Sequence, residues 1–249
     1  MKRDVVYILR ENIDSYELRY SLRSIDENFP HRKVWFVGGQ PSDLMPDGRI
    51  RHKQKGMTKW DRVKSSLKEI VKNGDITDEF FLFNDDFFVM SEQSENFINF
   101  SNGTLEKRVL DIRKRTGRVS NYVRSLDLIR HKLIMRGFDS VSFAVHLPML
   151  LDKEKVKHTL EVFDEPMFRS IYGNINRIPY IYHEDVKIYD NITKPQFEDY
   201  CSTTEVSFRE GAVGKIIRER FDKPSRFEVD ELPTYPHELY TEEGDEIRS

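Results

Sequence analysis

Cysteine is nearly absent from the sequence, since Cys201 is the single one among 249 residues. An internal disulfide and a cysteine-rich zinc site are therefore excluded. Long hydrophobic runs are missing too: no segment approaches the ~18 apolar residues of a membrane span, and the amino-terminal stretch MKRDVVYILREN is too short for a signal-peptide core. These absences predict a soluble, cytoplasmic protein with no membrane span.

A strong charge of either sign is also lacking. The 40 Lys and Arg residues against 43 Asp and Glu residues give a formal net charge of -3, so nucleic acid is a possible partner that bulk charge does not support. Aromatic residues, in contrast, are plentiful: 17 Phe and 11 Tyr supply enough apolar area for a sizeable core. A chain of 249 residues with this composition favours one larger α/β domain.

The first third of the chain alternates between two kinds of pattern. Short apolar, β-branched runs predict buried strands, and stretches whose apolar residues recur three and four positions apart predict helices. The order strand–helix–strand–helix–strand predicts a Rossmann-like, mostly parallel central sheet flanked by helices. The predicted strands span 4–9, 33–39 and 78–90, and the predicted helices span 15–29 and 58–74.

The second half of the chain is less regular and more helical. Two stretches look extended, 140–151 and 177–191, while helical periodicity occurs at 104–117, 119–136, 152–163 and 208–222. We predict a single domain over residues 1–224. An acidic, turn-rich tail over residues 225–249 is expected to be peripheral or disordered.

The stretch FLFNDDFFVM (81–90) holds the strongest chemical signal. It places Asn84, Asp85 and Asp86 among seven apolar residues, where unpaired carboxylates cost several kcal/mol each if buried. In open α/β sheets, ligands bind outside the carboxyl ends of the strands. Two carboxylates at that position suit Mg²⁺ or Mn²⁺, which prefer oxygen ligands and are commonly shared with a diphosphate. The alternative is a turn that carries the chain into solvent.

Several motifs resemble the Stealth family when they are taken as an ordered set. ELRYSLRSIDENFPHRKVWFVGG (17–39), followed by FLFNDDFFV (81–89), resembles the second conserved region of that family. HLPMLLDKEKVKHTLEVF (146–163) and MFRS (167–170) resemble the third region. The resemblance covers roughly residues 4–170. The Stealth family includes bacterial capsular polysaccharide phosphotransferases and the catalytic subunit of GlcNAc-1-phosphotransferase.

What the resemblance implies is a GT-A-like catalytic domain that moves a sugar 1-phosphate from a nucleotide-sugar donor to an acceptor hydroxyl of a glycan or surface polymer. Asp85 and Asp86 would then be the metal and diphosphate site, with Mg²⁺ or Mn²⁺ as cofactor. Asp61, His146 and Arg169 would match the catalytic residues of the family.

Other candidate residues follow from their chemistry. Arg19 and Arg23 lie four apart on the first helix, where guanidinium groups suit a donor diphosphate, together with Asn84; the alternative is a solvated basic face. His146 lies in an apolar run, so it is either a core residue or a group that accepts a proton near neutral pH. A second polar cluster, HED at 183–185, is either a turn or a further contact to metal or acceptor.

Two other functions stay open. A GT-A glycosyltransferase could move only the sugar, to a polysaccharide or to modified phage DNA, and its leaving group would be a nucleoside diphosphate. A non-catalytic binding module could instead use the arginine-rich segment 107–132 to hold an anionic partner. The alternative for that segment is a pair of solvated amphipathic helices.

Overall fold

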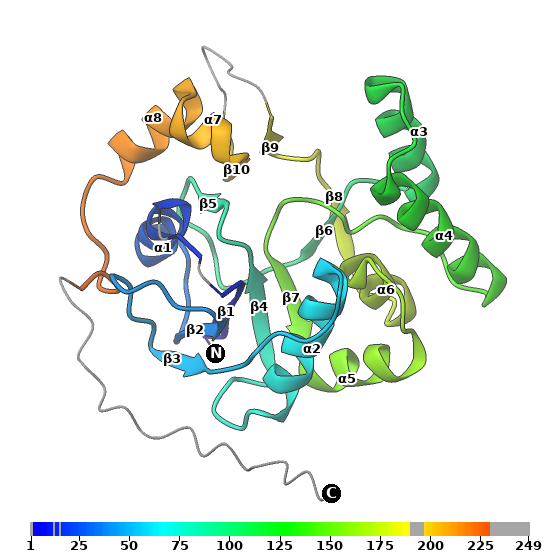
Figure 1. Ribbon diagram of the computed structural model, residues 1–249, viewed down its shortest axis with the longest axis horizontal. Helices are drawn as coiled ribbons and strands as arrows, with labels where there is room; N and C mark the ends of the chain where they lie inside the picture. Colours follow the sequence, from blue (N-terminus) through cyan, green and yellow to red (C-terminus); the bar gives the residue numbers. More distant parts are fainter. Residues whose placement is uncertain (1, 12, 15, 190–196, 230–249) are drawn as a thin grey trace, which may run out of the picture.

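The computed structural model describes residues 2–11, 13–14, 16–189 and 197–229. Its centre is a five-stranded sheet with the strand order β3-β2-β1-β4-β7 (Figure 1). β1 pairs in parallel with β2 and β4, and only the edge strand β7 is antiparallel. The predicted α/β class with a mostly parallel central sheet is confirmed. The strands are β1 (Asp4–Leu9), β2 (Val34–Gly38), β3 (Gly48–Ile50), β4 (Glu79–Phe83) and β7 (Met149–Asp152).

Both faces of the sheet are covered, which explains why its strands are apolar on both sides. Because side chains alternate along a strand, Val5 and Tyr7 of β1 pack against one layer and Val6 packs against the other. The first layer is formed by α1 (Tyr16–Asn28). The second is formed by α2 (Lys59–Lys72), α5 (Lys153–Val162) and α6 (Phe168–Ile175).

Among the described residues, the remaining elements form two small sheets and four helices around this centre (Figure 1). β5 (Phe87–Val89), β10 (Tyr200–Thr203) and β9 (Lys187–Ile188) form one sheet, which packs against α7 (Glu205–Arg209) and α8 (Ala212–Arg220). β6 (Asn99–Ser101) pairs with β8 (Tyr180–Tyr182). α3 (Leu105–Thr116) and α4 (Asn121–Met135) form a hairpin at one end of the molecule.

Three element predictions are wrong, and in two of them a polar or glycine residue ends an element inside the predicted span. The predicted strand 78–90 is two strands, because the turn at 84–86 sends β4 and β5 into different sheets. The predicted helix 208–222 is broken at Gly211, which caps α8. Only the last part of 140–151, Met149–Leu151, enters a strand of the central sheet. β3 and β10 lie in segments for which the sequence predicted no strand.

The segment expected to form a tail begins inside the packed core. Phe227 is 1% exposed and belongs to the same cluster as α1 and β1, and Glu228 forms a β-bridge with Leu44. Residues 230–249 lie outside the described part of the chain. Among the described residues, no helix is both long and apolar enough to cross a bilayer.

Candidate active site

The candidate site lies at the carboxyl end of β4, where three distant segments of the chain meet. β1 runs parallel to β4, so Ile8 near its carboxyl end lies beside the turn that begins at Asn84. β7 runs antiparallel to β4, with Met149 opposite Leu82. The lead-in to β7 therefore arrives at the same edge, and it carries His146. The sheet topology, and not proximity in sequence, brings His146 to the turn.

A cavity of about 300 Å³ opens at this edge. Three of the residues predicted for the site line it together: Asn84, His146 and Arg169. Its remaining wall is mainly apolar and aromatic, with Trp60 from α2 and Tyr122 from α4. An apolar pocket with a few convergent polar groups is the usual form of a small-molecule site.

Arg169 brings a positive charge to the wall of this cavity. Its Nη1 donates to the carbonyl oxygens of Leu147 (2.6 Å) and Val145 (3.3 Å), and its guanidinium lies over the ring of Phe87. Burial lowers the pKa of Arg169 to about 10, against the opposing effect of Asp86. It forms no ion pair with any carboxylate of the described residues. A cation held by neutral carbonyls in a cavity suits an anionic ligand such as a phosphate.

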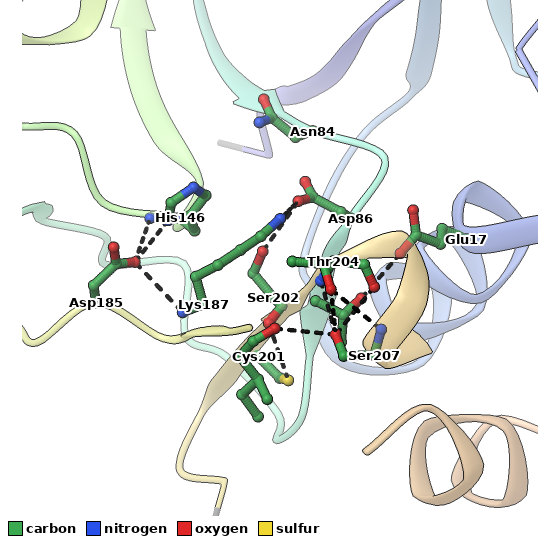
Figure 2. A network of polar contacts seen from close by, with 12 residues as sticks. Glu17, Asn84, Asp86, His146, Asp185, Lys187, Cys201, Ser202, Thr204 and Ser207 are labelled. Carbon is green, nitrogen blue, oxygen red and sulfur yellow. Dashed lines mark hydrogen bonds and ion pairs between the residues drawn. The ribbon is translucent and has the colours of Figure 1, made fainter. Parts of the chain in front are cut away.

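His146 is held by a carboxylate on its far side. Its Nδ1 lies 2.7 Å from Oδ1 of Asp185 (Figure 2). Oδ2 of Asp185 accepts a hydrogen bond from Nη2 of Arg108 at 2.7 Å. Burial alone would raise the pKa of Asp185, but the hydrogen bond from His146 and the charges of His146 and Arg108 lower it to about 2. His146 is therefore half-buried and oriented, and it is not enclosed in the core.

A second cluster of charges surrounds the turn itself. Lys187 of β9 forms an ion pair with Asp86, whose Oδ2 also accepts a hydrogen bond from Ser202 of β10 at 3.2 Å (Figure 2). Burial and the charge of Asp86 raise the pKa of Asp85. Burial also raises the pKa of Glu17, on α1, to about 7, with further contributions from Asp86 and Asp85. Negative charge at the turn thus exceeds what Lys187 neutralises.

This excess of negative charge fits a bound divalent cation. Asp85 and Asp86 are hard oxygen ligands, and the raised pKa of Asp85 shows that added positive charge would stabilise its ionised form. No group of three or more His, Cys, Asp or Glu side chains that could hold a metal occurs in the part of the chain that the structure describes. The residues therefore fit a cation that takes one or two carboxylates from the protein and its other ligands from a substrate, as Mg²⁺ does with diphosphates.

Three other predicted residues lie in structural interactions outside this arrangement. Arg23 forms a two-bond ion pair with Glu228, at 2.7 Å for both Nε and Nη2, and Arg19 forms ion pairs with Asp43 and Glu228. Asp61 closes the capping box at the start of α2, where the hydrogen bonds from Thr58 lower its pKa. Asp61 does not line the cavity, although its neighbour Trp60 does.

Three residues of the site were missed or undervalued in the sequence. Asp185 lies in the HED cluster, and the sequence pattern alone could not distinguish a binding cluster from a turn there. Lys187 lies two positions further along the same strand-like run. Glu17 occurs in the motif that carries the family resemblance, but only its hydrogen bond from Thr203 in the folded chain shows that it lies near the acidic turn.

No family model matches the chain, and no curated protein matches it. The solved structures to which the chain is similar include two glycosyltransferases and a synthase. The glycosyltransferase GlyE of Streptococcus pneumoniae TIGR4 is 12% identical over 89% of this chain, with a TM-score of 0.37. The galactosyltransferase LgtC, in complex with donor and acceptor sugar analogues, is 9% identical over 88% of this chain and 94% of its own, with a TM-score of 0.42.

The third structure, a 4-diphosphocytidyl-2C-methyl-D-erythritol synthase, is 10% identical over 74% of this chain and 90% of its own, with a TM-score of 0.37. The chain spans 50% of the GlyE chain that it matches. Likenesses with TM-scores below 0.5 carry no argument about activity. The resemblance to the Stealth family stays a prediction.

Proposed function

We propose that the chain is a nucleotide-sugar transferase with a GT-A-like fold, which uses Mg²⁺ or Mn²⁺ and moves a sugar 1-phosphate to an acceptor hydroxyl on a glycan or surface polymer. One observation carries the proposal. Asn84, His146 and Arg169 line a single cavity beside the carboxylates Asp85 and Asp86, at the carboxyl edge of a mostly parallel sheet.

Each residue has a role that its surroundings support. Asp85 and Asp86 would hold the cation, which neutralises the donor diphosphate when bound. Arg169 binds phosphoryl oxygens, because its charge lies on the cavity wall without a carboxylate partner in the described residues. Asn84 offers its amide to the same oxygens. His146 accepts the proton of the acceptor hydroxyl through Nε2, since Nδ1 is engaged by Asp185.

The structural contacts favour His146 over Asp61 as the base. Asp61 is hydrogen-bonded to the Thr58 hydroxyl and backbone, and a lowered pKa weakens a carboxylate as a proton acceptor. Arg19 and Arg23 are engaged by carboxylates, so we assign them a part in holding α1 to Asp43 and Glu228.

The released nucleotide decides between the two transfers. In phosphosugar transfer the acceptor oxygen attacks the β-phosphorus and a nucleoside monophosphate leaves, whereas in sugar transfer it attacks the anomeric carbon and a nucleoside diphosphate leaves. A screen of UDP-, GDP- and other nucleoside-diphosphate sugars with Mg²⁺ or Mn²⁺ measures which nucleotide accumulates. Release of UMP or a comparable monophosphate is expected; release of UDP or GDP would support the glycosyltransferase alternative.

The same assay tests the carboxylates. Asp85→Asn and Asp86→Asn are expected to abolish donor turnover and to keep the fold. Asp139→Asn removes the charge of an exposed aspartate on the loop after α4, and it is expected to keep full turnover. Full activity in both site variants would overturn the metal site.

A specific observation also supports a second function, the binding of an anionic polymer. Arg113, Arg118 and Arg124 lie exposed around the turn between α3 and α4, and they form no ion pair within the described residues. Charge of this kind binds polyanions with a strong dependence on salt. Binding of a teichoic-type polymer or of duplex DNA without metal, together with no turnover of any donor, would favour this function over catalysis.

A further inference from the structure

We propose that Asp185 is a positioning residue of the site: it fixes the orientation and tautomer of His146, and Arg108 of α3 holds Asp185 in place. The proposal rests on the proposed function, in which His146 accepts a proton from the acceptor. It assigns a role to one residue of the HED cluster, which the sequence pattern alone left as either a turn or a further contact to metal or acceptor.

The contacts of Asp185 occupy both of its oxygens. Oδ1 accepts from Nδ1 of His146 at 2.7 Å and from the backbone N–H groups of His146 at 3.3 Å and Lys187 at 3.4 Å. Oδ2 accepts from Nη2 of Arg108 at 2.7 Å. The carboxylate is therefore held on both sides and cannot rotate away from the imidazole without breaking an ion pair.

These contacts fix the proton on one nitrogen of the ring. An ionised carboxylate only accepts hydrogen bonds, and the ion pair with Arg108 at 2.7 Å keeps Asp185 ionised at neutral pH. Nδ1 of His146 must then be the donor. The neutral ring then carries its one in-plane lone pair on Nε2, which makes no hydrogen bond within the described part of the chain. Nε2 is thus the nitrogen that is free to accept a proton.

Arg108 makes the arrangement rigid and connects it to the helical hairpin. The side chains of Arg108 and Asp185 are 13% and 14% exposed, so the pair is largely shielded from water. α3 is anchored next to Arg108 by Val109, which is 4% exposed within the core that α3 shares with α4. Nε of Arg108 is buried without a hydrogen-bond partner within the described residues, and Asp185 is the carboxylate with which this guanidinium forms an ion pair.

A purely structural ion pair between α3 and residue 185 makes different predictions. It would stabilise the fold, but it would neither choose the tautomer of His146 nor affect turnover separately from donor binding. Its loss would appear in stability alone.

The deciding measurement is ¹⁵N NMR of the imidazole nitrogens in the full chain, with the His146 signal assigned by its loss in His146→Gln. In wild type we expect the Nδ1–H tautomer, which is the minor one in free histidine. Asp185→Asn is expected to move the ring toward the Nε2–H form, since the amide can itself donate to Nδ1. A wild-type ring in the Nε2–H form would overturn the proposal, and this outcome depends on no Asp185 variant.

Kinetics supply the second readout. Asp185→Asn is expected to lower kcat by about 100-fold, the size of a general base contribution, with the donor KM nearly unchanged. Asp185→Glu keeps the charge and is expected to restore the Nδ1–H tautomer and part of kcat. Unchanged kcat in a folded Asp185→Asn would overturn the positioning role.

Asp127 provides a matched control. It forms an ion pair with Arg130 at 3.1 Å and lies 3.8 Å from Nδ1 of His131, on the surface of α4. Asp127→Asn is expected to leave both kcat and the His146 signal unchanged. If no donor is turned over by wild type, the proposed function fails, while the tautomer experiment still decides whether Asp185 orients His146.

Discussion

Glu17 is expected to weaken the fold above neutral pH, and removing its charge should reveal this. The Glu17 carboxylate accepts a hydrogen bond from Thr203 at 3.1 Å and lies in the field of Asp85 and Asp86. Burial and these two charges raise its pKa from 4.5 to about 7. A raised pKa means that the folded state binds the proton more tightly than the unfolded state. Stability from this group is therefore present below pH 4.5 and lost as the pH rises toward 7.

The magnitude follows from the size of the shift. The change from 4.5 to about 7 corresponds to roughly 3 kcal/mol. Because Glu17 is only half-buried, solvent screening reduces this to about 1–2 kcal/mol. Glu17→Gln removes the charge and keeps an oxygen that can accept from Thr203. The variant should raise the free energy of unfolding at pH 8 by about 1–2 kcal/mol and change it little at pH 5.

Urea unfolding of wild type and Glu17→Gln at pH 5 and pH 8, without divalent cations, measures the difference. Glu27→Gln is the matched control, because Glu27 lies exposed on the same helix; it should change stability by less than about 0.5 kcal/mol at either pH. Equal stability of Glu17→Gln and wild type at pH 8 would refute the reasoning. An equal gain at both pH values would also refute it, since the gain would not arise from the carboxylate charge.

Four further outcomes are expected. Arg23→Gln should cost about 3 kcal/mol of stability, because Glu228 loses its two-bond ion pair and keeps only the longer one with Arg19 at 3.8 Å. The donor KM should be unchanged; a raised KM at full stability would support Arg23 as a donor ligand. Thr58→Ala should lower the free energy of unfolding by about 1 kcal/mol, because α2 loses its N-cap. Asp61→Asn should keep kcat in the donor assay, and a loss of kcat would indicate that Asp61 is the base. Mg²⁺ should raise the thermal midpoint of wild type more than that of Asp86→Asn, and an equal rise would place the cation elsewhere.

The individual strands and helices of the central layer could be predicted, because each is marked by apolar residues that lie next to each other or recur every three or four positions. The central strands are apolar on both faces, and helix α2 repeats its apolar residues every three or four positions. The turn at Asn84 was also predicted as a chemical site, from the mismatch of two carboxylates with their apolar neighbours. Such signals are carried by neighbours in sequence, so composition and spacing suffice to find them.

Contacts between distant residues could not be predicted in this way. Arg23 looked like a phosphate ligand because its partner, Glu228, lies 205 residues away in a segment expected to be a tail. Asp185 looked like a turn residue because its hydrogen bond to His146 spans 39 residues. In both cases the side chain was judged correctly as a charge that needs a partner. Which partner it finds is decided by sheet order and by the antiparallel edge strand, neither of which spacing shows.

FLFNDDFFVM illustrates why the site needs the second half of the chain. Its apolar halves belong to two different sheets, and Asn84, Asp85 and Asp86 form the turn between them. The charge of Asp86 is then balanced by Lys187 and Ser202, which are partners in neighbouring strands β9 and β10. The small sheet therefore brings β5 and the groups that hold its acidic turn together. A βαβ sheet alone would present the same two carboxylates without the ion pair from Lys187, so the candidate site depends on residues far beyond the strands that carry it.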